Sequence, residues 1–153
     1  MDSKALILLL NCGGTFMLIT VSVGGDSWEE ESPNLKLGLW GKCNSLGCRY
    51  TKWGDVSPWS HAVRAFALVA VLASGLGVLV SLMRLCKDME GKIVGAMFLG
   101  AGVCMLIALT MFTSSLIDHV KSSSLISWGW SYFLGWIGTI FAFICTALAS
   151  MLR

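Results

Sequence analysis

The chain has 153 residues, and 56% of them are hydrophobic while only 13% are charged. A soluble protein has roughly a quarter of its residues charged, so this composition indicates a protein of the lipid bilayer. The net charge is +2 and the basic residues are scattered, which excludes the concentrated basic surface of a nucleic-acid-binding protein.

Four runs with almost no charged residue predict four membrane-spanning helices, at about residues 5–25, 65–83, 93–117 and 131–152. Each run is close to the roughly 20 residues with which a helix crosses the hydrocarbon core. Backbone polar groups in lipid must be paired within a helix or a closed barrel, and the runs lack the alternation of barrel strands. We therefore expect an all-α membrane protein, a four-transmembrane helix bundle that forms a single tetraspan domain over residues 1–153.

The first run allows two interpretations. Lys4 and the apolar residues after it would suit a cleaved signal peptide, with small residues such as Ser22 and Gly24 at a cleavage point. The run is longer than the roughly 7–15 apolar residues of a signal peptide, which favours a retained first span. Asn11 within this span is expected to face another helix, because an amide that faces lipid has no hydrogen-bond partner.

The connection at residues 26–62 is the one long loop between the predicted spans. It begins with four acidic residues between Asp26 and Glu31, which we interpret as a solvated edge in preference to a cation site. The residues at 35–40 and at 49–53 are typical of strands, so the loop is predicted to form a small antiparallel sheet.

Two of the six cysteines, Cys43 and Cys48, lie in this loop. They would face each other across the turn between the two predicted strands. A disulfide bond between them would stabilise the loop by about 2 kcal/mol, because it restrains the unfolded chain. The other four cysteines lie in predicted spans or in the short link at 84–92, so this is the pair that an oxidising compartment would join.

Ser57 and Pro58 predict the start of the helix that contains the second span. Serine is favoured at the N-cap of a helix and proline in its first turn. The helix would then enter the membrane near Arg64. Arg64 has two interpretations: we favour an anchor at the membrane surface, and the alternative is an ion pair with an acidic residue of the loop.

Aromatic residues gather at the start of the fourth span, at Trp128, Trp130, Tyr132 and Trp136. Amphipathic rings favour the boundary between lipid and water. We therefore expect these four side chains to anchor the helix at the membrane surface.

The link at 84–92 carries Arg84, Lys87 and Lys92, a dense basic group that favours a cytoplasmic location. Four spans then place both termini in the cytoplasm, and the loop at 26–62 and the link at 118–130 outside the cell. An external loop also agrees with its two cysteines, because disulfides persist in oxidising compartments. We expect a multi-pass protein of the plasma membrane, with the cell junction as a further location.

No arrangement of residues in the sequence predicts catalysis. His61 and His119 each stand alone without a second ligand at metal spacing, and the motifs HExxH and GxSxG do not occur. We therefore expect no enzymatic activity, no metal, no cofactor and no small-molecule substrate.

The long loop resembles that of a known family. Trp28, then Gly38-Leu39-Trp40, then Cys43 and Cys48, between the first and second spans of a four-span chain, are similar to the claudin and peripheral myelin protein superfamily. The segments 64–66 and 130–136 are most similar to the epithelial membrane protein and lens fibre intrinsic membrane protein branch. The resemblance covers nearly the whole chain.

The resemblance implies a left-handed helix bundle that carries a small extracellular antiparallel β-sheet of four or five strands, with a disulfide between Cys43 and Cys48. It implies that Trp40 packs where the sheet meets the bundle. Two features differ from claudins: the chain ends at Arg153 without a longer scaffold-binding tail, and it has no N-x-[ST] sequon. The signature positions, with a structural role, are Trp28, Gly38, Leu39, Trp40 and Arg64.

An aromatic loop without catalytic groups predicts an organiser of membrane contacts. We expect the protein to organise cell-cell contacts, junctions or membrane packing through its first extracellular loop. Its partners would be the lipid bilayer, further copies of the chain, or other membrane proteins in the same or a facing membrane. Two alternatives are an accessory subunit that modulates a channel or receptor, and a claudin-like paracellular barrier or pore with selecting charges near Lys52 and Asp55.

Overall fold

A computed structural model describes residues 3–32, 34–87, 90–120 and 126–151. Parts of the predicted links, at 88–89 and 121–125, lie outside the described residues. All four long helices in the described ranges are apolar enough to cross a membrane, which confirms the predicted four-span bundle. The helices are α1 at Ser3–Gly24, α2 at Pro58–Cys86, α3 at Gly91–Val120 and α4 at Trp130–Met151.

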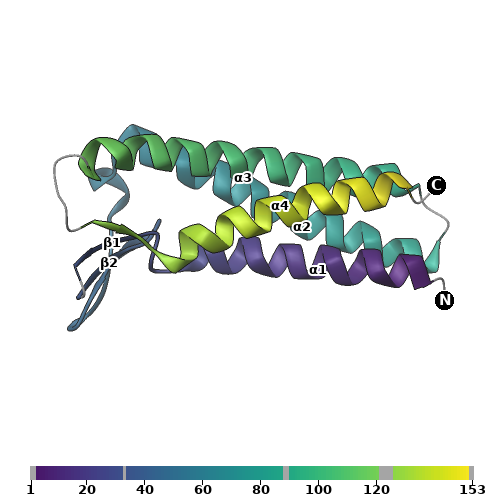
Figure 1. Ribbon diagram of the computed structural model, residues 1–153, viewed down its shortest axis with the longest axis horizontal. Coiled ribbons are helices and arrows are strands. Elements are labelled where there is room, and N and C mark those ends of the chain that lie inside the picture. Colours follow the sequence, from purple (N-terminus) through teal and green to yellow (C-terminus); the bar gives the residue numbers. More distant parts are fainter. Residues whose placement is uncertain (1–2, 33, 88–89, 121–125, 152–153) are drawn as a thin grey trace.

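The helices form a ring in which α1 and α3 each pack against α2 and α4. They run side by side, and both chain ends lie at the end of the bundle opposite the sheet (Figure 1). Small residues permit this close packing. A Cβ atom added to Gly77 of α2 would lie 2.6 Å from the ring of Phe98 in α3, so glycine makes the space in which Phe98 is buried.

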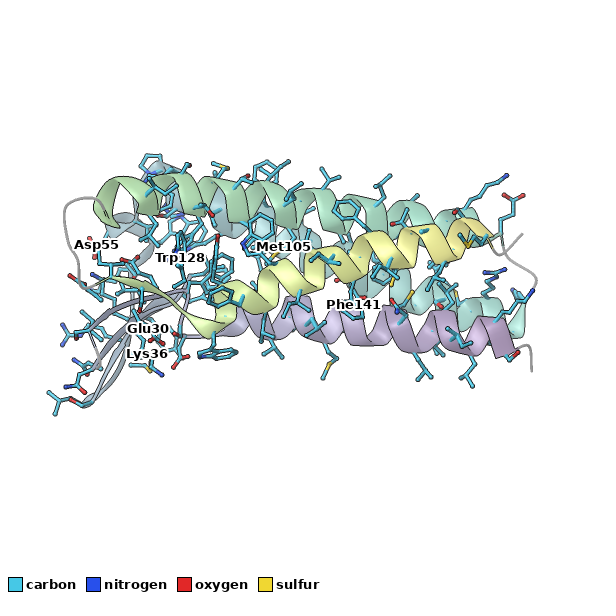
Figure 2. All side chains as sticks on the ribbon, viewed as in Figure 1. Glu30, Lys36, Asp55, Met105, Trp128 and Phe141 are labelled. Atoms are coloured by element: carbon cyan, nitrogen blue, oxygen red, sulfur yellow. A yellow bond between two sulfur atoms is a disulfide. The ribbon has the colours of Figure 1, made fainter. Side chains whose placement is uncertain are left out.

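The interior of the bundle contains two hydrophobic clusters. One includes Trp28, Met105 and Tyr132 and lies toward the sheet, whereas the other includes Leu8 and Phe98 and lies toward the chain ends. Large apolar side chains also cover the outside of the helices, as a helix surrounded by lipid requires. Figure 2 shows Met105 within the bundle and Trp128 beside the sheet.

A polar cluster connects α1 to α4 within this apolar interior. Cys145 Sγ donates to Asn11 Oδ1 at 2.9 Å and lies 3.3 Å from Thr15 Oγ1. Thr15 Oγ1 also donates to the Asn11 carbonyl at 2.8 Å. Asn11 therefore faces a neighbouring helix, as its sequence position predicts.

Five short strands form one antiparallel sheet in the described part of the chain, in the order β4-β3-β2-β1-β5. Cys43 of β3 and Cys48 of β4 lie directly opposite each other and are joined by a disulfide. The sheet lies beyond the ends of α1 and α4 and beside the outer turns of α2 and α3 (Figure 1). Its strands are β1 at Glu29–Ser32, β2 at Leu35–Leu37, β3 at Gly41–Asn44, β4 at Gly47–Tyr50 and β5 at Ser127–Trp128.

The strands differ from the predicted ones. The strand predicted at 35–40 ends at Leu37, because the next three residues turn toward the bundle, and the strand predicted at 49–53 is found at Gly47–Tyr50. Strand β5 is not predicted from the sequence at all. It pairs Trp128 with Glu29, so the link between α3 and α4 contributes to the same sheet as the long loop.

Helix α2 begins at Pro58, as the sequence predicts, but Ser57 caps it differently. The Ser57 hydroxyl makes no hydrogen bond to the helix backbone and instead lies 2.9 Å from the Ser60 hydroxyl. The Ser57 carbonyl accepts from the His61 backbone N–H. Pro58 precedes Arg64 by six residues, and a helix rises 1.5 Å per residue. The outer turns of α2 therefore extend about 9 Å beyond Arg64, alongside the sheet.

Candidate functional site

Two tryptophans close the end of α1 where it meets the sheet. The last four carbonyl groups of a helix have no partner within the helix, and burying them unpaired is costly. Trp28 Nε1 donates to the Ser22 carbonyl at 2.7 Å, and Trp40 Nε1 donates to the Val23 carbonyl at 2.8 Å. The long loop therefore supplies the hydrogen bonds that the next turn of helix would have made.

Trp28 is fully buried and connects three helices. Its ring meets the ring of Phe112 in α3 edge-on, with centroids 5.0 Å apart, and the ring of Tyr132 in α4 at 6.3 Å. The Tyr132 hydroxyl lies 2.8 Å from Thr113 Oγ1 of α3. Such ring pairs each contribute about 0.5–1.5 kcal/mol beyond the area that they bury, so Trp28 holds α3 and α4 to the end of α1.

Arg64 of α2 binds the main chain of the loop. Its Nε donates to the Leu39 carbonyl at 2.6 Å, and its Cζ lies 5.4 Å from the centre of the Trp40 ring. The residue is only 6% exposed, and it forms no ion pair with a carboxylate among the described side chains. The alternative ion pair is therefore wrong for the described side chains, because the guanidinium is enclosed against Trp40 and a carbonyl group. The anchor at the membrane surface stays a prediction.

Gly38 lets the loop backbone cross the end of α1. A Cβ atom at this position would lie 2.7 Å from the Gly25 carbonyl oxygen and 3.0 Å from Asp26 Cα, both of which are main-chain atoms. The Gly38 N–H donates to the Gly41 carbonyl at 2.9 Å. This approach requires glycine, because every other residue carries a Cβ.

The signature residues predicted from the resemblance thus come together, apart from the cysteines, which lie in the hairpin beyond. We call this assembly the junction. It consists of Trp28, Gly38, Leu39, Trp40 and Arg64 around the end of α1.

The start of α4 is bonded to the junction as well. The N–H groups of Gly129 and Ser131 donate to the carbonyls of Trp28 and Ser27, at 3.1 and 3.0 Å. The Ser22 hydroxyl of α1 donates to the Ser131 carbonyl at 2.7 Å. Sequence reasoning missed these contacts, because main-chain partners leave no pattern in the sequence.

The prediction that Tyr132 anchors α4 at the membrane surface is wrong, whereas the same prediction for Trp128, which is half-buried, stays a prediction. The Trp128 and Tyr132 rings are stacked with centroids 4.5 Å apart, and Tyr132 is buried. Trp130, between them in the sequence, is exposed and remains available for that role. Strand β5 ends at Trp128 and α4 begins at Trp130, so the direction of the side chains changes within this aromatic segment. The sequence alone therefore does not show which rings face lipid.

The outer edge of the sheet is open. Strand β4 is the last strand, and all four of its residues are exposed. Large apolar side chains lie on and beside it, with Leu46 95%, Tyr50 79% and Trp53 72% exposed. A soluble surface seldom presents such side chains together unless they meet a partner.

A cavity of about 470 Å³ lies between the sheet and the outer ends of α2 and α3. Its apolar wall includes Val63, Phe112 and Leu116, and Arg64 also lines it. No group of three or more His, Cys, Asp or Glu side chains that could hold a metal occurs in the part of the chain that the structure describes. The acidic residues interpreted as a solvated edge include Glu30, which accepts from the Ser27 hydroxyl at 2.6 Å.

Comparison with known proteins agrees with this fold. Residues 1–149 match the PMP-22/EMP/MP20/Claudin family. The chain belongs to this family. The chain is 25% identical to epithelial membrane protein 1 of Homo sapiens over 143 residues, 91% of the chain and 90% of the relative. It is 31% identical to claudin domain-containing protein 2 of Mus musculus over 127 residues, which cover 75% of the chain and 68% of the relative.

Membership of the PMP-22/EMP/MP20/Claudin family confirms the resemblance found in the sequence. It also confirms the fold class, a bundle of four apolar helices with a five-stranded antiparallel sheet. Proteins of this family are structural membrane proteins without enzymatic activity, so this chain is a non-enzymatic, multi-pass membrane protein.

Proposed function

We propose that the protein organises contacts at the plasma membrane, and that its sheet binds proteins of the same or a facing cell. Junctions, adhesion and membrane packing are the processes that such contacts serve. The family supports a structural role in a membrane. The geometry supports a role for the sheet, because the junction contacts all four helices and leaves the far edge of the sheet open.

Three features support an external sheet and cytoplasmic termini. Both chain ends lie at the end of the bundle opposite the sheet (Figure 1). The Cys43–Cys48 disulfide lies in the sheet, and disulfides persist outside the cytoplasm. Arg84 at the end of α2, Lys87 after it and Lys92 at the start of α3 form a basic group, and basic residues favour the cytoplasmic side.

The open edge of β4 is the observation that carries the proposal. An unpaired edge strand offers a row of main-chain N–H and C=O groups to a further strand. Leu46 and Tyr50 are exposed in the β3–β4 hairpin and the edge strand, and Trp53 follows them, so a partner would gain both hydrogen bonds and apolar contact.

A cell-aggregation assay tests this function. Cells that express the chain should aggregate, or recruit cells that carry a partner, more than cells without it, and Tyr50→Asp should remove the effect because a charge on the edge opposes pairing. Asn34→Asp, which adds the same charge at an exposed position in the turn between β1 and β2, is the matched control. Surface biotinylation should show equal delivery of both variants.

Three results would count against the proposal. If neither aggregation nor self-association depends on Tyr50, the contact function loses its support. Purification from native cells in mild detergent together with one larger channel or receptor in constant ratio would indicate an accessory subunit. A change of transepithelial conductance after charge reversal at Lys52 and Asp55 would indicate a paracellular pore.

A further inference from the structure

The cavity between the sheet and the bundle has a buried cation on its wall. Arg64 is 6% exposed and lines the cavity, and its Nε is held by the Leu39 carbonyl. Among the described residues, no hydrogen-bond partner and no carboxylate is found for its two terminal nitrogens. A guanidinium presents its donors as a planar fork that matches the oxygens of a phosphate or carboxylate.

Two acidic residues and one basic residue, Lys42, are exposed in the lining of the same cavity. Glu31 and Asp55 line it and are exposed, and neither forms an ion pair among the described side chains. Trp59, the second residue of α2, lines it as well. Carboxylates and an aromatic face are the groups that hold an ammonium ion. Figure 2 shows Asp55 at the sheet end of the molecule.

The position of the cavity along the bundle corresponds to the lipid headgroups. Leu68 and Val69 of α2 are exposed apolar residues, as lipid contact requires, and they begin one turn beyond Arg64. One helical turn is about 5.4 Å long. The headgroup layer on each side of the hydrocarbon core is about 5–7 Å thick, so Arg64 lies at headgroup depth.

We propose that this cavity binds the zwitterionic headgroup of a phospholipid in the leaflet next to the sheet. The phosphate accepts hydrogen bonds from the terminal nitrogens of Arg64, and the ammonium group lies between Glu31 and Asp55, against Trp59. Val63, Phe112 and Leu116 contact the glycerol and the first part of an acyl chain. The volume of about 470 Å³ is within the roughly 300–1,000 Å³ of ligand pockets.

The cavity has a cation, Arg64, and two exposed carboxylates, Glu31 and Asp55, so it favours a zwitterionic headgroup over an anionic one. A phosphatidylglycerol headgroup carries the phosphate but no cation, and it would place neutral or negative groups beside Glu31 and Asp55. Phosphatidylcholine and phosphatidylethanolamine carry both charges in the order that the cavity presents. The preference for zwitterionic over anionic lipid is therefore the property to measure.

Native mass spectrometry of the full chain, purified in detergent and depleted of lipid, measures this preference. The chain is titrated with phosphatidylcholine, phosphatidylethanolamine or phosphatidylglycerol of equal acyl length. The double variant Glu31→Gln and Asp55→Asn should lower the zwitterionic preference about three- to tenfold, as expected for two exposed charge pairs. Glu90→Gln, which removes an exposed carboxylate at the far end of the bundle, should leave it unchanged.

Arg64→Lys is the second variant. Lysine keeps the positive charge but lacks the planar set of donors of a guanidinium. Every phospholipid should therefore bind about tenfold more weakly, while the ranking of the three lipids by affinity stays the same. Equal binding of the three lipids, or an unchanged order in the double variant, would overturn the proposal even if Arg64→Lys does not fold. Binding of soluble phosphocholine as tightly as of phosphatidylcholine would overturn it too, because the ligand would then not be a membrane lipid.

Discussion

Single hydrogen bonds at the end of α1 determine how the loop meets the membrane helix. The indole N–H groups of Trp28 and Trp40 satisfy neighbouring carbonyls, those of Ser22 and Val23. A buried acceptor that loses its donor costs about 1–3 kcal/mol. The two rings are thus required for their polar atoms as well as for their size.

Trp40→Phe tests this requirement, because it keeps an aromatic ring and removes the N–H. We expect the variant to be about 1–3 kcal/mol less stable to thermal or denaturant unfolding in detergent, since the Val23 carbonyl is left without its donor. Trp53→Phe, at an exposed ring, should have little effect. Trp40→Ala should go further and retain the protein in the early secretory pathway, and normal delivery of that variant to the cell surface would contradict this.

Gly38→Ala tests the close crossing of two main chains. The new Cβ would lie 2.7 Å from the Gly25 carbonyl oxygen, and main-chain atoms cannot rotate away as a side chain can. Overpacking of this kind costs about 1–3 kcal/mol, which thermal unfolding would detect. Gly54→Ala is the control, because a Cβ there has nothing within 4 Å. Equal stability of the two variants would show that the loop can shift.

Among the elements, the β3–β4 hairpin is the most exposed part of the sheet. The ladder runs from β5, beside the bundle, to β4, whose four residues are all exposed. Elements with few buried contacts open locally at a low free-energy cost. The Cys43–Cys48 disulfide joins the two strands of this exposed hairpin.

Replacing both cysteines with serine should therefore loosen the hairpin and leave the bundle intact. The short closed loop gives the disulfide about 2 kcal/mol in the chain-entropy model. Hydrogen exchange should become faster at Gly47–Tyr50 and stay unchanged within α1 to α4. If exchange rises equally in the helices, the disulfide stabilises the whole fold.

The helices could be predicted from the sequence more fully than the sheet. Lipid forces a long uncharged segment into a helix, so the spans are visible as composition alone. The position of Arg64 was visible, but its partner was not, because that partner is the Leu39 main-chain carbonyl. Strand β5 has two residues, too few for any alternation to be recognised.

In the junction too, the sequence indicated the residues but not all of their contacts. The resemblance identified the residues of the junction by type and spacing, before any contact was known. It did not identify Thr113, and although Ser131 lies in the matching segment 130–136, its contact was not predicted, because both contacts depend on how α3 and α4 meet the loop. Small polar residues occur throughout the spans, so their sequence positions carry no distinguishing signal.

For the whole molecule, the proposed orientation in the membrane can be tested with a cysteine that the chain already has. Cys86 is free and exposed at the end of α2, whereas Cys12 and Cys145 are buried. If the sheet is external, a membrane-impermeant maleimide should modify Cys86 only after the cells are permeabilised. Ser127→Cys, exposed at the sheet end, should react on intact cells. Reaction of Cys86 on intact cells would reverse the proposed topology.

The pairing of β1 with β5 sets an order of events during synthesis. Glu29 lies opposite Trp128, so about 100 residues must be made between the two partners before they can pair. At 5–20 residues per second the ribosome needs roughly 5–20 s for this interval. During that time Trp28 lacks Tyr132, and the early loop has only the helices already inserted to protect it. The first loop of a nascent chain can therefore complete its fold only after β5 and the last span have been synthesised.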